Sequence, residues 1–283
     1  MAKVKIVTNA VCDLSPAEAE HFGIGLIPEA IQFGTETFLT TTDLTPQLLY
    51  KKMRAADKLP TGSHANVSMY MDAFLSAGGG AYTDVVCINM TSRMSGSYNT
   101  AFIAKNMLEE EGFPVRIHIV DSLQLTYGLT FLTLEAVKLA DAGGTAEEII
   151  AHVEAVKGKI GEYFVMRSLT NAKKGGRIGA IRALTADALG VKPVMMFRDG
   201  MVSDVAIARN FPQALERLVK YYESRAVRGK RAVVFHADNL ADAQSVKNAL
   251  SALDPEAEIS IRWLGSGIGI YTGEGCVGIT FWE

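Results

Sequence analysis

Short apolar runs alternate with helical patterns through the first half of this chain, and this alternation constrains its fold more than any other feature. Val4–Thr8 and Asp84–Met90 are short, β-branched runs typical of buried strands. Ser15-Pro16-Ala17-Glu18 marks a helix start, in which Ser15 caps the helix and Glu18 completes a capping box. Further helices are predicted over about 67–77, 97–111, 125–141 and 145–158. The order strand, helix, strand predicts a mostly parallel sheet with helices on both faces.

The pattern changes after about residue 160. Val194–Phe197, the Asp199-Gly200 turn and Met201–Ala208 predict a β-hairpin. A helix is predicted from Gly175-Gly176-Arg177-Ile178 to near Gly190, and the remaining elements are helices at about 211–225 and 240–252 and strands at Tyr163–Arg167, Arg231–His236, Ile259–Trp263 and Cys276–Trp282. This order predicts an α+β domain with a mixed sheet. We therefore predict an α/β protein with two domains, 1–158 and 159–283, in agreement with a typical length of ~150 residues per domain.

The charge balance excludes several classes of partner. Lys and Arg number 28 against 31 Asp and Glu, which leaves a net charge of −3 and no general attraction to nucleic acid. The longest uncharged run, Ser122–Leu134, has 13 residues, whereas a membrane helix needs ~20. Cys12, Cys87 and Cys276 are odd in number and far apart, as expected in a reducing compartment. These features predict a cytoplasmic protein without a transmembrane segment or a nucleic-acid partner.

Histidine and cysteine spacings give no indication of a metal site, and no cofactor motif is convincing. No pair of these residues has the spacing of metal ligands. Gly265-Ser-Gly267-Ile-Gly269 is superficially similar to a dinucleotide fingerprint, but we predict a glycine-rich crossover because a strand-like run follows instead of a helix. Cys12 is either a nucleophile or, more simply, a small buried apolar residue. We expect no metal and no cofactor.

Two loops rich in hydroxyl groups are the best candidates for a binding site. Thr91-Ser92-Arg93-Met94-Ser95-Gly96-Ser97 lies between a predicted strand and a predicted helix, where hydroxyls and backbone N–H groups suit an anion. Helix capping would explain one of these hydroxyls. Thr61-Gly62-Ser63-His64 is a second such segment, and capping is again the simpler explanation. Arg177 and Arg209 are possible anion partners or surface ion-pairing residues.

No general base is evident beside a nucleophile, which favours a binding protein over a self-sufficient enzyme. Taken together, the motifs resemble those of the DegV family, the fatty-acid-binding subunits of bacterial fatty acid kinase. The resemblance extends over essentially the whole chain and rests on Ile6-Val7-Thr8 with Asp13-Leu14, Thr61, Thr91-Ser92-x-x-Ser95-Gly96, Asp121-Ser122, Gly175-Gly176-Arg177-Ile178, Val191-Lys192-Pro193 and Thr272-Gly273-x-Gly275.

The resemblance implies a carrier that holds one long-chain fatty acid between two domains and presents it to a separate kinase subunit, which forms the acyl phosphate. It implies that Arg177 and Arg209 lie near the carboxyl group or face the kinase, and that the chain has no catalytic residue of its own. The residues that it assigns to the carboxyl group are Thr61, Gly62, Thr91, Ser92, Ser95, Gly96, Tyr271 and Thr272. The alternatives are a stand-alone α/β enzyme of the small-molecule kinase or acyl-transfer type, or a carrier of another amphiphile.

Three positions depart from the motifs that the resemblance leads us to expect. Asn9-Ala10 stands in place of Asp-Ser, and Thr61-Gly62 in place of Thr-Ser. Tyr271-Thr272-Gly273-Glu274-Gly275 stands in place of His-Thr-Gly-Pro-Gly. A tyrosine donates a hydrogen bond as a histidine does, but tyrosine side chains are ordinarily neutral at pH 7. We therefore expect fatty-acid affinity to change little between pH 6 and 8.

Overall fold

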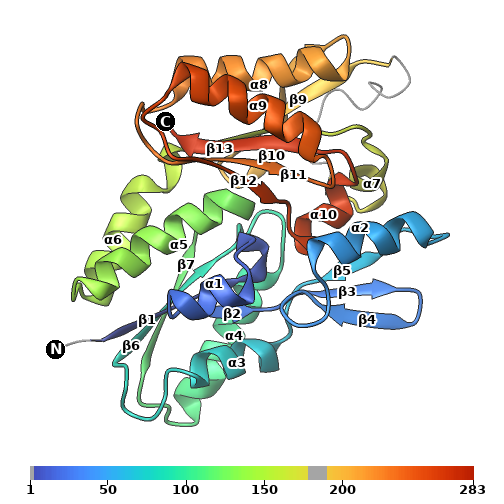
Figure 1. Cartoon of the computed structure of the whole chain (residues 1–283). Helices are drawn as coiled ribbons and strands as arrows, with labels where there is room; N and C mark the ends of the chain where they lie inside the picture. The colour runs from blue at the N-terminus through green and yellow to red at the C-terminus, as the bar shows by residue number, and fades with distance from the viewer. Residues whose placement is uncertain (1–2, 178–189) are drawn as a thin grey trace. The chain divides into compact units, whose positions relative to one another are not determined.

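The computed structural model describes residues 3–177 and 190–283. The chain divides into two compact units (Figure 1). Met1–Leu44 and Gly62–Gly158 form the N-terminal unit, whereas Thr45–Thr61 and Lys159–Glu283 form the C-terminal unit. The predicted domains, 1–158 and 159–283, are two consecutive blocks, so they differ from these units in the segment Thr45–Thr61. The helix predicted between Gly175 and Gly190 falls mainly outside the described residues.

A four-stranded parallel sheet forms the centre of the N-terminal unit, as predicted. Its strands lie in the order β2-β1-β6-β7, and they span Gly25–Ile27, Val4–Asn9, Asp84–Asn89 and Arg116–Asp121. Every pairing between neighbours is parallel. In this register Val7 lies beside Cys87, and Asn89 lies beside Asp121. The strands β1, β6 and β7 therefore bring their carboxyl ends to one edge of the sheet.

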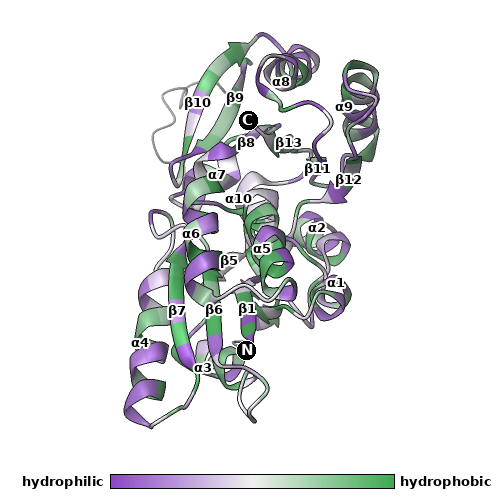
Figure 2. Ribbon diagram, turned by 90° about the vertical axis from the view of Figure 1, so that its left-hand side faces the viewer, coloured by the Kyte–Doolittle hydropathy of each residue, from purple (hydrophilic) through white to green (hydrophobic). Residues whose placement is uncertain are grey.

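Helices cover both faces of this sheet, which confirms the predicted layers. The core on one face combines alternate strand residues such as Val85 and Cys87 with Tyr70, Phe74 and Ala104 of the facing helices α3 and α4. The helices α5 and α6 pack on the opposite face, and Figure 2 shows α4 and α5 on opposite sides of the strands. The helices are α1 (Pro16–His21), α3 (Val67–Leu75), α4 (Ser97–Glu110), α5 (Thr126–Asp141) and α6 (Ala146–Val156), and a small sheet combines β3 (Ala30–Phe33), β4 (Glu36–Leu39) and β5 (Thr61–Ser63).

Local sequence determines where several of these helices begin. The Ser15 hydroxyl accepts a hydrogen bond from the Glu18 N–H, and the Glu18 carboxylate accepts one from the Ser15 N–H, as in the predicted capping box. Thr145 and Glu148 form the same reciprocal pair at the start of α6. These starts follow from residues close together in the sequence, so they were predictable.

The C-terminal unit contains the mixed six-stranded sheet that the sequence predicts. Its strands lie in the order β10-β9-β8-β13-β11-β12, and only the pair β11–β12 is parallel. The strands are β8 (Ile160–Val165), β9 (Lys192–Arg198), β10 (Met201–Ala208), β11 (Ala232–His236), β12 (Ile259–Trp263) and β13 (Val277–Trp282). The helices α8 (Phe211–Arg225) and α9 (Leu240–Leu253) complete its core through residues such as Leu218 and Val246.

Two short helices of the C-terminal unit, α10 and α7, differ from the sequence-based expectations. The glycine-rich crossover was wrong, because Ser266–Thr272 form a helix, α10, directly after β12. Contacts from elsewhere stabilise α10: a Cβ on Gly269 would lie 2.6 Å from Tyr50 Oη, and Asn171 Nδ2 donates to the Ile270 carbonyl (3.2 Å). Tyr50 belongs to α2 (Pro46–Ala55) and Asn171 to the unpredicted α7 (Thr170–Lys174). Tertiary packing here outweighs the low helix propensity of glycine.

Candidate functional site

The predicted hydroxyl loop, Thr91–Ser97, lies at the carboxyl edge of the N-terminal sheet. It follows β6 and leads directly into α4. Ser92 and Gly96 are exposed, Ser95 is half-buried, and Thr91 and Ser97 are buried. The Ser95 and Ser97 hydroxyls are 2.8 Å apart, and Ser95 Oγ also accepts from the Ser97 N–H (3.2 Å). The N-cap residue of α4 is Gly96, and no side chain caps the helix, so capping does not explain these hydroxyls, while Ser92 faces solvent.

Asp121 ties this loop to the neighbouring strand. Its Oδ1 accepts from the backbone N–H groups of Ser92 and Leu123, each at 3.1 Å. Leu123 has a positive φ of 51°, a conformation that costs free energy for a residue other than glycine and so requires such support. Lys157 Nζ donates to the Asp121 carbonyl oxygen at 3.0 Å. Asp121 belongs to the motif Asp121-Ser122 but was not among the predicted site residues.

A buried network of neutral side chains lies next to the hydroxyl loop. Asn9 Nδ2 donates to Tyr70 Oη (2.8 Å), and Tyr70 Oη donates to Asn89 Oδ1 (3.0 Å). The Met90 N–H donates to both Asn9 Oδ1 (2.8 Å) and Asn89 Oδ1 (3.1 Å). Asn9, Tyr70 and Asn89 have no solvent exposure. Burial raises the pKa of Tyr70 above its usual value, so this hydroxyl keeps its proton.

The sequence patterns did not predict this network, although the polar residues at the ends of two strands indicated it. Asn9 and Asn89 are polar residues that end two apolar strand runs, and carboxyl ends of parallel strands meet at one edge. At Asn9 the sequence indicates only a departure from the Asp-Ser motif of the family. Tyr70 lies four residues before Phe74 on the buried face of α3, where an aromatic residue predicts core packing. Asn89 Nδ2 has no hydrogen-bond partner among the described residues, which is rare for a buried donor.

The second predicted segment lies partly beside the hydroxyl loop. Gly62 and His64 belong to the N-terminal unit, and a Cβ added to Gly96 would lie 3.2 Å from His64 Cε1. The segment Gly62–His64 and the loop residue Gly96 are therefore brought together. Thr61 is exposed, and it is the last residue of the segment that groups with the C-terminal unit.

The C-terminal unit brings two of the remaining predicted residues together. The Arg177 guanidinium lies 5.5 Å from the centroid of the Tyr271 ring, a cation–π distance, and Arg177 Nη1 donates to the Gly175 carbonyl (2.8 Å). Thr272 follows Tyr271 at the end of α10 and is buried. Arg209 lies elsewhere in the sequence of this unit, exposed between β10 and α8, where its backbone N–H donates to Gln213 Oε1.

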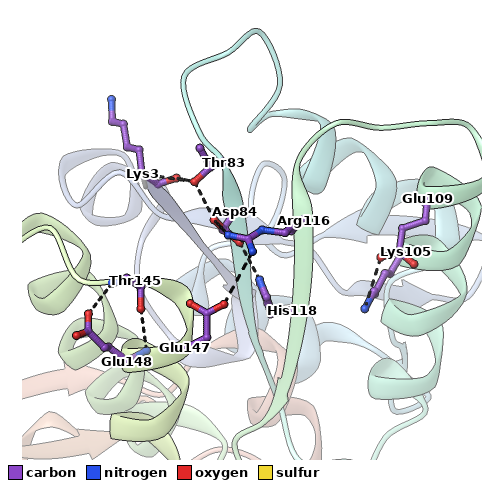
Figure 3. Close-up of polar contacts among 10 residues, drawn as sticks. All are labelled: Lys3, Thr83, Asp84, Lys105, Glu109, Arg116, His118, Thr145, Glu147 and Glu148. Atoms are coloured by element: carbon purple, nitrogen blue, oxygen red, sulfur yellow. Dashed lines mark hydrogen bonds and ion pairs between the residues drawn. The ribbon is translucent and has the colours of Figure 1, made fainter. Parts of the chain in front are cut away.

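A charged cluster occupies the opposite, amino edge of the N-terminal sheet (Figure 3). The Asp84 side chain has no exposure, and Arg116 Nε contacts its Oδ1 at 2.9 Å. The His118 ring donates to the same oxygen (2.9 Å), while Thr83 Oγ1 (2.8 Å) and Arg116 Nη2 (2.9 Å) donate to Oδ2. Burial opposes ionisation of Asp84, but these hydrogen bonds outweigh it and lower its pKa. The carboxylate has no acceptor position left for a ligand.

The described residues give little support to a nucleophilic cysteine or to a metal site. All three cysteines are buried, and burial raises the pKa of the Cys12 thiol, which favours apolar packing over a nucleophilic role. Within residues 3–177 and 190–283, no group of three or more His, Cys, Asp or Glu side chains could hold a metal ion. In the same part of the chain, no helix is both long enough and apolar enough to cross a membrane.

Comparison with known proteins identifies the family. A family model described as "Uncharacterised protein, DegV family" matches residues 3–283. The chain belongs to the DegV family. A DegV domain-containing protein from Halalkalibacterium halodurans is 28% identical over 284 residues, which cover 100% of this chain and 99% of the relative. Protein DegV from Bacillus subtilis is 26% identical over 279 residues, 98% of each chain.

Solved structures of DegV proteins share the whole fold. The crystal structure of DegV from Bacillus subtilis, described as a fatty acid binding protein, superposes with a TM-score of 0.89 at 25% identity and covers 100% of both chains. The fatty acid kinase B3 protein of Streptococcus pneumoniae, loaded with linoleic acid, has a TM-score of 0.84 at 21% identity, over 100% of this chain and 99% of that one. The likeness to the Streptococcus pneumoniae protein shows that the two chains share a fold.

Proposed function

We propose that this DegV protein binds one long-chain fatty acid and that its hydroxyl loop binds the carboxyl group. The observation that carries the proposal is the position of Ser92, Ser95 and Gly96 at the carboxyl edge of a parallel sheet, directly before the 14-residue helix α4. Ligands of open α/β sheets bind at this edge, and a helix N-terminus favours a negative charge. The description of the Bacillus subtilis relative as a fatty acid binding protein supports the same choice of ligand.

The physical chemistry of a fatty acid fits a site of this kind. Each methylene removed from water contributes ~0.8 kcal/mol, so a long acyl chain contributes on the order of 10 kcal/mol before ordering costs. An unpaired carboxylate would be costly to bury. Hydroxyl and amide donors offset that cost, at about 1.5–3 kcal/mol for each hydrogen bond to a charged group.

The contributions of Thr61, Tyr271 and Thr272 to the carboxyl site stay a prediction. Under this proposal the Tyr271 hydroxyl donates a hydrogen bond to the carboxyl group, and affinity for the acid changes little between pH 6 and 8. Fluorescence titration with a fatty acid at both pH values tests this point. A tenfold fall across the range would contradict the role given to Tyr271.

The proposed ligand can be identified directly. Organic extraction of the purified protein, followed by mass spectrometry, should release a fatty acid of ordinary membrane chain length. Calorimetric titration of delipidated protein with palmitate and oleate should show one binding site. An empty extract together with no binding of either acid would overturn the proposal, and competition by another amphiphile would point to a different ligand.

We further propose that the bound acid is phosphorylated by a separate kinase subunit. Arg209 is exposed and Arg177 lies against Tyr271, so both are candidates for the surface that meets the kinase. ATP consumption should require this chain, a fatty acid and a fatty acid kinase subunit together. The variant Arg209→Glu should bind oleate normally but slow the coupled reaction at least tenfold. Turnover of ATP by the isolated chain would instead favour a stand-alone enzyme.

A further inference from the structure

We propose that Tyr70 is a positioning residue, which holds the hydroxyl loop in the geometry that distinguishes a carboxylate from other polar head groups. The inference rests on the proposed function and deepens it. It arises from a hydrogen-bonded chain that runs from a fully buried tyrosine to a half-buried serine of the loop. Tyr70 itself has no solvent exposure, so it acts through its neighbours.

The network holds the beginning of the loop through amide groups. Met90 is the residue that precedes Thr91, and its N–H donates to Asn9 Oδ1 at 2.8 Å and Asn89 Oδ1 at 3.1 Å. Since Asn9 Oδ1 accepts this bond, its Nδ2 is directed at Tyr70 Oη, which it reaches at 2.8 Å. Tyr70 Oη in turn donates to Asn89 Oδ1 at 3.0 Å. One hydroxyl thus fixes the orientation of both amides that hold Met90.

The network also reaches the end of the loop through Met90. Ser97, the first residue of α4, has no exposure. The Ser97 hydroxyl is 2.8 Å from that of Ser95, a residue of the proposed carboxyl site. Ser97 Oγ also lies 3.5 Å from Met90 Sδ, so the two ends of the loop touch. Tyr70 is therefore linked to both ends of the loop through Asn9, Asn89 and Met90.

Removing the Tyr70 hydroxyl would leave two buried polar groups without this partner: Asn9 Nδ2 and Asn89 Oδ1. Binding groups must be held within about 0.5 Å to give full hydrogen-bond strength, and surrounding residues provide that restraint. Loss of the restraint should weaken contacts to the carboxylate but leave the acyl chain's contacts unchanged. The expected signature is a change in selectivity for the head group, which a purely structural role would not produce.

The test compares oleate with oleyl alcohol, which has the same chain but no carboxylate. In Tyr70→Phe we expect the affinity for oleate to fall about tenfold and the affinity for oleyl alcohol to stay within about twofold of wild type. Ser97→Ala breaks the links of Ser97 to Ser95 and to Met90 Sδ. It should lower the oleate preference in the same direction, so it serves if Tyr70→Phe does not fold. Both affinities are measured by calorimetry on delipidated protein.

Tyr222→Phe is the matched control. Tyr222 is also buried, and its hydroxyl donates to Asp254 Oδ2 (2.9 Å) in the C-terminal unit; its removal should leave the oleate preference unchanged. Equal losses for oleate and oleyl alcohol in Tyr70→Phe, or an unchanged preference in both loop variants, would overturn the inference while the proposed function stands. Failure of the wild type to bind oleate would overturn the proposed function and this inference with it.

Discussion

The two edges of the N-terminal sheet are held in chemically different ways. At the amino edge the Asp84 carboxylate accepts hydrogen bonds from Arg116, His118 and Thr83. At the carboxyl edge, at the other end of β6, the amides of Asn9 and Asn89 and the phenol of Tyr70 form a neutral network. The cluster at the amino edge is ionic, and its charged groups hydrogen-bond to one another. The neutral network leads outward to a loop whose Ser92 is exposed and whose Ser95 is half-buried.

The difference between the two edges indicates that one edge stabilises the fold and the other positions the binding loop. A buried carboxylate with all its acceptor positions filled stabilises the fold but offers nothing to a ligand. Neutral hydroxyls can redirect their single protons at little cost, so they hold a loop and still donate to an incoming carboxylate. Four substitutions test whether the two edges act separately.

Loss of the Asp84 charge should give the largest change in stability. Asp84→Asn keeps the size of the side chain but leaves Arg116 and His118 without a carboxylate, and we expect a loss of about 2 kcal/mol at pH 7 in urea unfolding. The native pKa of Asp84 is lowered from its usual 3.8, so the stabilisation is present above that value and is lost as pH falls through the native pKa. The difference between the two proteins should therefore shrink below pH 4. Oleate affinity should be unchanged; a large loss of affinity would contradict the separation of the two edges.

Loss of the Ser95 hydroxyl should affect binding more than stability. Ser95→Ala removes a donor from the proposed carboxyl site, and one hydrogen bond to a charged group corresponds to about a tenfold loss of oleate affinity. Since Ser95 is half-buried and hydrogen-bonded to Ser97, the free energy of unfolding should fall by about 1 kcal/mol or less. Calorimetric titration and urea unfolding of the same preparation separate the two effects. Unaltered affinity would remove Ser95 from the site.

Loss of the Asp121 carboxylate should loosen the hydroxyl loop. In Asp121→Ala the Ser92 and Leu123 N–H groups lose their shared acceptor, and we expect about 1 kcal/mol of local destabilisation. Hydrogen exchange at these two amides should speed up, whereas exchange in β6 should not. Asp121→Asn retains an acceptor oxygen and should restore most of the protection. Equal acceleration throughout the unit would indicate global instead of local loosening.

Loss of the Glu147 charge should have the smallest effect. Its carboxylate lies 4.0 Å from Arg116, and both side chains are more than half exposed, at 66% and 63%. Exposed ion pairs at this distance contribute little because water and salt screen them. Glu147→Gln should leave the thermal midpoint unchanged. A shift of several degrees would mean that the Asp84 cluster extends to this residue.

Local patterns predicted the layers of the fold but not every element. The parallel and mixed sheets, the β9–β10 hairpin and the capping box at Ser15 were predicted from local sequence patterns. The helix α10 was not, because Gly269 and its neighbours favour a loop until α2 and α7 pack against them. The helix α7 was also missed, since five residues give too short a pattern.

The candidate site likewise contains residues that local sequence patterns predicted and residues that they did not. Thr91, Ser92 and Ser95 were singled out because several hydroxyls lie close together between a strand and a helix. Asn9, Tyr70 and Asn89 come from three separate segments, and only the parallel register of β1 and β6 and the packing of α3 bring them together. Each looks ordinary alone: a polar strand end, a core aromatic residue, another polar strand end. The hydrogen bonds among these three residues form only in the folded chain, and one sequence does not give the distances between their side chains.

The grouping of Thr45–Thr61 with the C-terminal unit has a consequence for biosynthesis. Tyr50 Oη donates to the Leu264 carbonyl (3.2 Å), and the Tyr50 ring stacks on Trp263, so the partners of α2 are synthesised as many as 214 residues after Tyr50. When α2 leaves the ribosome, it therefore lacks these contacts until the intervening chain, including Gly62–Gly158, has been made. The C-terminal unit is completed by closing this long loop, and a chaperone that covers α2 would protect it in the interval.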